Sequence, residues 1–168
     1  SGVIYHSIGV NGAKASDYNK FRLFNEQLPV LNPDLVIISL GTNESFDKQS
    51  GEQYFANLDQ MIQGIKEKNP QACVLVMTSP PSVLHRKYKN TFIEKYAEII
   101  EENAHVKNYA VWDLLQVFGG NKAISRNAAK GYMARDKVHY SKAGYEKQGE
   151  LFFEAFLQSY ELFKSTKQ

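Results

Sequence analysis

Asp136 and His139, which lie three positions apart, are the residues best suited to chemistry in this sequence. An aspartate at this spacing can bind one ring nitrogen of the imidazole and leave the other nitrogen free to take a proton from a nucleophile. The pair would then act as a general base with its orienting carboxylate. The Asp-x-x-His pattern also arises by chance, and the alternative is a surface histidine with no chemical role.

Two glycine-containing runs could contribute to the same site. The run GTNE at residues 41–44 directly follows the apolar residues 35–40, and the run GVNG at residues 9–12 follows the β-rich residues 3–7. An asparagine amide or a backbone N–H in a glycine turn can donate to an oxygen that becomes negative during a reaction. The alternatives are structural, because asparagine often stabilises a turn and glycine permits a tight one.

The elements that must position these residues alternate between strands and helices. Strands are predicted at residues 3–7, 35–40, 73–78 and 109–112. Helices are predicted at residues 17–30, 51–69, 87–105 and 141–163, the last with Ser141 as its N-cap. This alternation predicts an α/β fold of three layers, in which a parallel sheet carries helices on both faces.

Sites in open parallel sheets form beyond the carboxyl ends of the strands. The two glycine-containing runs follow strands directly, and Asp136 and His139 precede the last predicted helix. Residues 119–135 are too long for a simple connector, so we expect them to have a functional role. The fold therefore predicts that these segments meet at one edge of the sheet.

Length and composition are those of one globular domain, predicted to span residues 1–168, with 43% hydrophobic and 23% charged residues. A net charge of +2 gives no strong field that would recruit nucleic acid. No apolar run approaches the roughly 20 residues of a membrane span. The histidine spacing predicts no metal site and the glycines fit no nucleotide fingerprint, so no cofactor is expected. Cys73, the single cysteine, lies among apolar residues and is predicted to be buried.

The order and spacing of these motifs resemble the SGNH (GDSL-type) hydrolases over about residues 5–145. Gly12 matches the glycine of the second conserved block, residues 41–44 match the third, and Asp136 with His139 match the fifth. The resemblance implies a flavodoxin-like parallel sheet and a Ser-His-Asp acyl transfer. It implies that His139 is the base, that Asp136 orients it, and that Asn43 and Gly12 donate to the oxyanion. Glu44 replaces the usual aspartate and is expected to support its loop.

The first block of that family, Gly-Asp-Ser, carries the nucleophile and does not occur in this sequence. The nucleophile is therefore unknown: Ser79 precedes two prolines, Ser141 is a predicted cap, and Ser7 is the least unsuitable substitute. In the flavodoxin-like strand order 2-1-3-4-5, the first strand lies in the middle of the sheet. We expect that this chain holds the second to fifth blocks. An upstream segment of the same protein would supply the first strand and the serine.

A second layer of resemblance concerns the substrate. Trp112-Asp113, the run FGG at residues 118–120 and the polar loop that follows resemble bacterial carbohydrate O-acetylesterases, most of all peptidoglycan O-acetylesterases. The resemblance implies an acetylated glycan as substrate and a periplasmic or secreted location. Two alternatives stay open: a lipase or thioesterase of the same superfamily, and a non-catalytic carbohydrate-binding or scaffold domain.

Overall fold

A three-stranded parallel sheet forms the centre of the protein. The computed structural model describes residues 2–166, so residues 1, 167 and 168 of the predicted domain lie outside the described residues. The strands are β1 (Leu35–Ile38), β2 (Cys73–Met77) and β5 (Ala110–Trp112), in the order β1-β2-β5. Their positions confirm three of the four predicted strands and the parallel arrangement.

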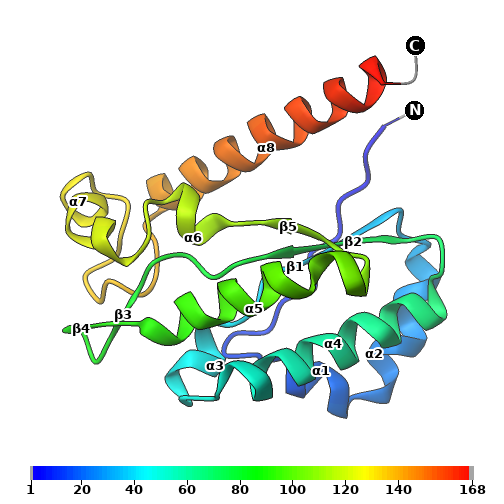
Figure 1. Ribbon diagram of the computed structural model, residues 1–168, viewed down its shortest axis with the longest axis horizontal. Coiled ribbons are helices and arrows are strands. Elements are labelled where there is room, and N and C mark those ends of the chain that lie inside the picture. The colour runs from blue at the N-terminus through cyan, green and yellow to red at the C-terminus, as the bar shows by residue number, and fades with distance from the viewer. Residues whose placement is uncertain (1, 167–168) are drawn as a thin grey trace.

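Long helices lie on both faces of this sheet (Figure 1), as the predicted three-layer α/β fold requires. On one face, α4 (Gly51–Lys68) follows β1 and α5 (Thr91–Lys107) follows β2. The other face carries α8 (Lys142–Ser165), whose N-cap Ser141 accepts from the backbone N–H of Gly144 at 3.1 Å. The predicted N-cap of the last helix is thereby confirmed.

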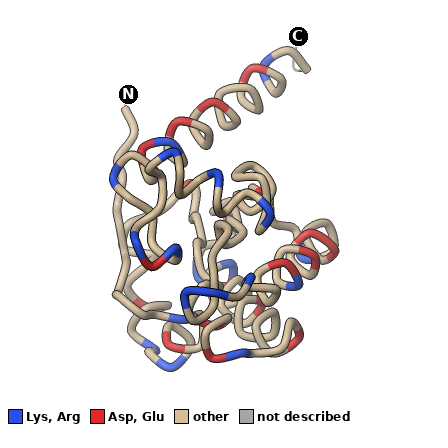
Figure 2. Tube along the Cα trace, turned by 90° about the vertical axis from the view of Figure 1, so that its left-hand side faces the viewer, with Lys and Arg blue, Asp and Glu red and all other residues tan. Residues whose placement is uncertain are grey.

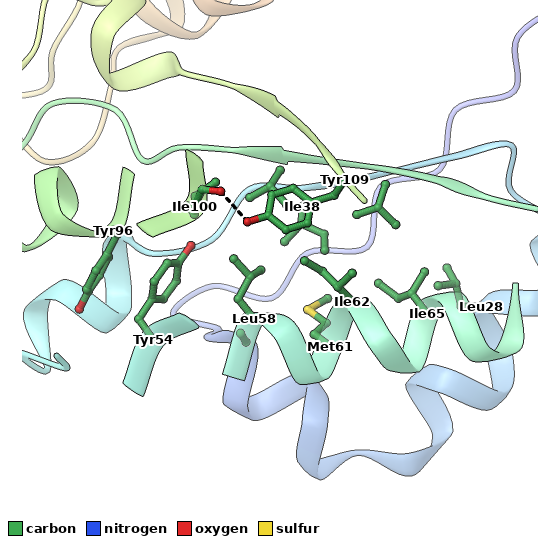
Figure 3. Packing of buried hydrophobic residues seen from close by; sticks show 13 residues of the cluster. Leu28, Ile38, Tyr54, Leu58, Met61, Ile62, Ile65, Tyr96, Ile100 and Tyr109 are labelled. Carbon is green, nitrogen blue, oxygen red and sulfur yellow. Dashed lines mark hydrogen bonds between the residues drawn. The ribbon is translucent and has the colours of Figure 1, made fainter. Parts of the chain in front are cut away.

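The main core lies between the sheet and the pair α4 and α5 (Figure 3). Helix α4 buries one stripe at helical spacing: Tyr54, Leu58, Met61, Ile62 and Ile65. The Tyr54 ring stacks on Tyr96 of α5 with 4.2 Å between ring centroids. The Tyr109 hydroxyl donates to the Ile100 carbonyl at 2.6 Å, which fixes the middle of α5 against the start of β5.

A second buried cluster lies at the α8 side of the sheet, near the carboxyl ends of the strands. It contains Trp112, Phe118 and Tyr140, packed against partly buried residues that include Leu75 of β2 and Phe152 of α8. The Trp112 and Phe152 rings meet edge to face with 5.0 Å between centroids. This packing holds the first half of α8 on the sheet.

The predicted helix over residues 17–30 is interrupted in the structure. It consists of α1 (Ala15–Lys20), α2 (Arg22–Gln27) and the 3₁₀-helix η1 (Leu28–Leu31). The break falls at Phe21, whose extended backbone (φ −96°, ψ 93°) cannot continue a helix. Both short helices pack against α4 as a result.

Several short elements were not predicted. They are α3 (Thr42–Phe46), β3 (Val83–Leu84), β4 (Tyr88–Lys89), α6 (Leu114–Val117), η2 (Asn121–Ala123) and α7 (Ile124–Ala129). The pair β3 and β4 forms a hairpin, so α5 begins at Thr91 and not at residue 87 as predicted. The long loop over residues 119–135 is correspondingly half helical.

The predicted strand at residues 3–7 is wrong for this structure. Residues 2–10 belong to no strand and lie exposed, with Val3 96% exposed. Among the described residues, the one hydrogen bond to residues 2–9 comes from the Tyr18 hydroxyl to the Ile8 carbonyl at 3.4 Å. A β-rich run becomes a strand only when another strand offers its backbone groups, and none pairs with this segment.

Charged residues of both signs are mixed over the molecule. Lys and Arg alternate with Asp and Glu over the whole trace, and no large region carries one sign (Figure 2). Within residues 2–166, no helix combines the length and the apolar character needed to cross a bilayer. The same residues contain no group of His, Cys, Asp and Glu arranged to hold a metal ion. Cys73 is exposed, which corrects its predicted burial.

Candidate active site

The structure brings Asp136 and His139 into direct contact. The Oδ2 atom of Asp136 lies 2.8 Å from Nδ1 of His139. Its other oxygen, Oδ1, accepts the backbone N–H groups of Val138 at 2.9 Å and of His139 at 3.0 Å. The hydrogen bond to the imidazole, followed by the one from Val138, lowers the pKa of Asp136 to about 2. The carboxylate is therefore ionised at neutral pH.

The loop that carries this pair is fixed at both ends. Before the pair, the N–H of Ala134 donates to the His139 carbonyl at 2.9 Å, which closes the loop on itself. After the pair, buried Tyr140 donates its hydroxyl to the Pro81 carbonyl at 2.8 Å. The His139 side chain itself is 67% exposed. The imidazole is thus held by its Nδ1 side and open to a reactant on the other side.

The loop after β1 is organised around Glu44. This side chain is 1% exposed, and its Oε1 and Oε2 atoms accept the backbone N–H groups of Ala15 and Gly41, each at 2.9 Å. Burial raises the pKa of Glu44, while the two backbone hydrogen bonds oppose that rise. Glu44 therefore joins the loop after β1 to the start of α1, which agrees with the supporting role expected for it.

The predicted oxyanion donors lie beside each other. Asn43 donates from Nδ2 to the Ala13 carbonyl at 2.9 Å, next to Gly12 in the chain. An amide nitrogen carries two hydrogens, so Asn43 keeps a second one to donate. Gly12 has a positive φ of +80° and open space where a Cβ would stand, and its N–H has no partner within the described part of the chain. Both donors are therefore available to an acceptor.

The site has two halves, the loop with Asp136 and His139 and the loops with Gly12 and Asn43. The segment after β2 contacts both halves. Ser79 donates from Oγ to the Leu40 carbonyl at 3.3 Å, beside the loop that carries Asn43. Four residues on, the N–H of Val83 donates to the Lys137 carbonyl at 3.1 Å. In Figure 1, α3, the β3–β4 hairpin and the orange segment before α8 accordingly lie at the same end of the sheet.

Close packing at this point explains the glycine of the GTNE motif. Gly41 has a φ of +123°, and a Cβ there would approach the Ser79 hydroxyl to 2.6 Å. Only glycine tolerates both the conformation and the contact. No hydrogen bond within residues 2–166 joins His139 directly to Asn43 or Gly12, so the two halves meet through the 78–83 segment.

None of the three serines considered from the sequence contacts the imidazole. Ser79 is buried and donates to Leu40, while Ser141 caps α8 and donates to the Gly131 carbonyl at 2.6 Å. Ser7 lies in the exposed N-terminal segment. The nucleophile of the predicted mechanism therefore has no counterpart within the described residues.

A buried polar network behind the site was missed from the sequence. Asn90, fully buried, donates from Nδ2 to the hydroxyls of Ser45 at 2.7 Å and Ser82 at 3.1 Å, which joins α3 to the β3–β4 hairpin. Thr78 donates to Asp113 at 2.8 Å, next to Trp112. Trp112 is itself buried, and its ring packs against Phe152.

Comparison with known sequences decides the family. The sequence model of the GDSL-like Lipase/Acylhydrolase family matches residues 2–147. The chain belongs to this family. No curated protein matches the chain. The position of the match, which includes Gly12, Asn43, Asp136 and His139, agrees with the resemblance seen in the motifs.

Solved structures share this GDSL fold at low sequence identity. A peptidoglycan O-acetylesterase superposes with a TM-score of 0.79 at 22% identity, over 88% of this chain and 44% of that one. A lipase/acylhydrolase from Enterococcus faecalis gives 0.64 at 26% identity, over 86% and 70%. An acetyl xylan esterase gives 0.70 at 22% identity, over 88% and 78%. The chain thus spans less than half of the peptidoglycan O-acetylesterase chain.

Proposed function

We propose that this GDSL-family protein is a serine esterase in which His139 is the general base and Asp136 orients it. The observation that carries the proposal is the 2.8 Å contact between Asp136 Oδ2 and His139 Nδ1, with the imidazole otherwise exposed. Asp136 fixes the tautomer with a proton on Nδ1. The Nε2 atom then has a lone pair for the proton of a serine hydroxyl.

In the proposed reaction, a serine Oγ forms a bond to the ester carbonyl carbon while its proton passes to Nε2 of His139. The carbonyl oxygen becomes an oxyanion and accepts from the Asn43 amide and the Gly12 N–H. Collapse of this intermediate breaks the bond to the alcohol oxygen, which takes the proton from Nε2. Water then attacks the acyl-serine by the same route, and the products are a carboxylic acid and the free serine.

The serine of this proposal lies outside residues 1–168, on an upstream segment of the same protein. Two observations support that placement. No described serine hydroxyl contacts His139, and Ser79 and Ser141 are engaged in structural hydrogen bonds. The β-rich residues 3–8 also lack a strand partner, as they would if a neighbouring strand came from another segment.

For the substrate, we propose an O-acetylated glycan outside the cytoplasm. Support comes from the sequence resemblance at Trp112-Asp113 and residues 118–120. It also comes from two structures of the same fold, whose names are peptidoglycan O-acetylesterase and acetyl xylan esterase. A lipase or thioesterase would instead need a long apolar groove for the acyl chain.

The test compares substrates on the complete protein. We expect it to hydrolyse p-nitrophenyl acetate faster than p-nitrophenyl esters with long acyl chains, and to release acetate from O-acetylated peptidoglycan or acetylated xylan. Faster turnover of long-chain esters would favour the lipase alternative. A folded complete protein that binds the glycan but releases no acetate would overturn the enzymatic proposal in favour of a binding domain.

A further inference from the structure

The β3–β4 hairpin has a sharp boundary between a buried base and an exposed tip. Residues 81–84 are buried, and so is Asn90, whereas residues 85–89 between them are all exposed. Asn90 holds the base together, because its backbone N–H donates to the Ser82 carbonyl at 3.2 Å and its Nδ2 donates to the Ser82 hydroxyl at 3.1 Å. The tip therefore projects into solvent from a fixed base.

The base of the hairpin packs directly on the loop that carries His139. The backbone N–H of Val83 donates to the Lys137 carbonyl at 3.1 Å, and Val83 pairs with Lys89 across the hairpin. Lys137 lies between Asp136 and His139 in the chain. Figure 1 accordingly shows β3 and β4 at the same end of the molecule as the segment that precedes α8. A molecule bound at the tip would therefore lie beside the His139 loop.

The exposed tip and the His139 loop are both strongly basic, and we call them together the basic surface. Residues 85–89 and 135–139 contain five permanent cations: Arg86, Lys87, Lys89, Arg135 and Lys137. Their single carboxylate, Asp136, is bound to His139. With histidine neutral, these ten residues have a net charge of +4 in a chain whose net charge is +2, so the rest of the chain is net acidic. Figure 2 looks onto this end of the molecule.

The cations of the basic surface are not neutralised by the protein itself. Among residues 2–166 none of the five forms an ion pair, whereas Lys14, Lys107 and Lys147 elsewhere are bound to carboxylates. Lys87 has one contact of another kind, since its Nζ lies 5.4 Å from the centroid of the Tyr88 ring. Like charges gathered without partners repel one another, so a bound anion would stabilise this surface.

The backbone of the tip adopts a conformation that its residues disfavour. The Lys87 N–H donates to the Leu84 carbonyl at 3.1 Å, so His85 and Arg86 are the central residues of a turn, with φ angles of 50° and 62°. Turns with positive φ at both central residues normally carry Asn-Gly or Asp-Gly. Glycine in place of Arg86 would relieve the strain and lose the guanidinium. Because strain of this kind concentrates where side chains bind ligands, Arg86 is the residue of the surface to test.

We propose that the basic surface binds the carboxylates of an acidic glycan chain beside His139. The guanidinium of Arg86 can bind one carboxylate through two parallel N–H···O bonds, and Lys89 and Lys137 contribute point charges for others. Cations spread over two adjacent segments suit a chain with repeated charges better than a single small anion. The binding of carboxylates stands by itself, whereas the statement that the chain carries O-acetyl esters rests on the proposed function.

The charge of this surface determines which acetylated polymer is the better substrate. An acidic chain is attracted to the site, and salt screens this attraction over roughly 8–10 Å at physiological ionic strength. A neutral polymer gains nothing from the five cations. We therefore expect the protein to prefer a carboxylate-bearing acetylated glycan to a neutral one.

Binding is measured on the complete protein with a fluorescently labelled oligogalacturonate. The matched ligand is the same oligosaccharide after its carboxyl groups have been reduced to alcohols. We expect the acidic form to bind at low salt and to weaken as salt is added, and the reduced form to bind at least ~10-fold more weakly. Equal affinity for the two forms would overturn the proposal.

A double variant, His85→Asn with Arg86→Gly, separates the charge from the fold. It gives the turn the residues that its backbone favours, so the unfolding temperature should equal or exceed that of the parent. We expect it to bind oligogalacturonate on the order of 10-fold more weakly, through loss of a charge-assisted contact. Lys48→Gly is the matched control, because Lys48 is also exposed with a positive φ of 55°, and it should bind like the parent. Parent-like affinity in the folded double variant would overturn the proposal.

Two further measurements distinguish the proposal from a rival ligand and from the proposed function. Tighter binding of a single-stranded oligonucleotide of equal charge would assign the surface to nucleic acid and overturn the proposal. Acetate release is measured with O-acetylated pectin, which is acidic, and with acetylated xylan. Carboxylate binding that the double variant loses, without acetate release by the parent, would keep the surface and remove the proposed function. Acetate release together with parent-like affinity in the double variant would keep the esterase and remove the surface.

Discussion

At the scale of single residues, the orientation of His139 depends on one carboxylate. Replacing Asp136 by Asn should leave the fold intact, yet an amide cannot stabilise the imidazolium and favours the wrong tautomer. We expect kcat of the complete protein to fall by ~10³–10⁴-fold, as in other enzymes with this arrangement. The control is Asp34→Asn, at an exposed position before β1. An unchanged kcat in Asp136→Asn would show that the observed pair is only structural.

The pH dependence of stability tests the contact that Asp136 makes. The folded pKa of Asp136, about 2, lies below the ordinary carboxyl value. Its contribution to stability and to imidazole orientation is therefore complete above that ordinary value and is lost only as the pH falls toward 2. We expect the stability difference between the parent and Asp136→Asn, measured by urea denaturation, to shrink as the pH falls from the ordinary carboxyl value toward 2. A difference that does not change with pH over this range would contradict the assigned contact.

Glu44 should matter for stability more than any exposed carboxylate. A glutamine at this position offers one acceptor oxygen and turns its NH₂ group toward the second backbone N–H. We expect Glu44→Gln to lower the free energy of unfolding by ~1–3 kcal/mol, the cost of an unsatisfied buried group. Urea denaturation measures the change, with Glu102→Gln at an exposed position of α5 as control. Equal effects of the two substitutions would remove Glu44 as the link between the two loops.

At the scale of the elements, α8 and the active-site loop are joined by an unusually close contact. A Cβ added to Gly144 would lie 2.0 Å from the Tyr132 carbonyl oxygen, whereas one added to Gly149 on the same helix meets nothing within 4 Å. We expect Gly144→Ala to destabilise the protein by ~1–3 kcal/mol through overpacking. Gly149→Ala should be neutral or slightly stabilising, since alanine is the better helix former. Thermal unfolding of both variants compares them, and equal stability would disprove the contact.

The sequence predicted a helix or strand correctly where its apolar residues pack against another element of the same chain. The stripe of α4 and the apolar run of β2 are examples, and both were located to within one residue. It failed at residues 3–7, which have the composition of a strand but no neighbour to pair with. It also failed at Phe21, where tertiary packing of α1 and α2 on α4 overrides local helix propensity.

At the scale of the whole molecule, the candidate site could be predicted in part. Asp136 and His139 are close in sequence, so their spacing was enough to predict their contact. Glu44 reaches Ala15 across 29 positions and Asn90 reaches Ser45 across 45, and no local pattern encodes such bonds. The family motifs predicted which segments form the site. These segments meet because the carboxyl ends of parallel strands lie at the same edge of the sheet.

The exposed apolar surface of α8 belongs to this scale as well. It could not be predicted, because each local pattern describes an element and not what remains uncovered after the elements pack. Apolar side chains of α8 such as Phe153 and Phe156 are exposed, and so are Ile37 and Cys73 of the sheet.

The most direct measurement is the rate of p-nitrophenyl acetate hydrolysis by the complete protein and by its His139→Ala variant. Loss of the base should lower kcat at least ~10³-fold, while His105→Ala, at an exposed position near the end of α5, should keep the parent rate. Circular dichroism of each variant confirms that the fold is retained. A folded His139→Ala protein that hydrolyses the ester at the parent rate would contradict the account.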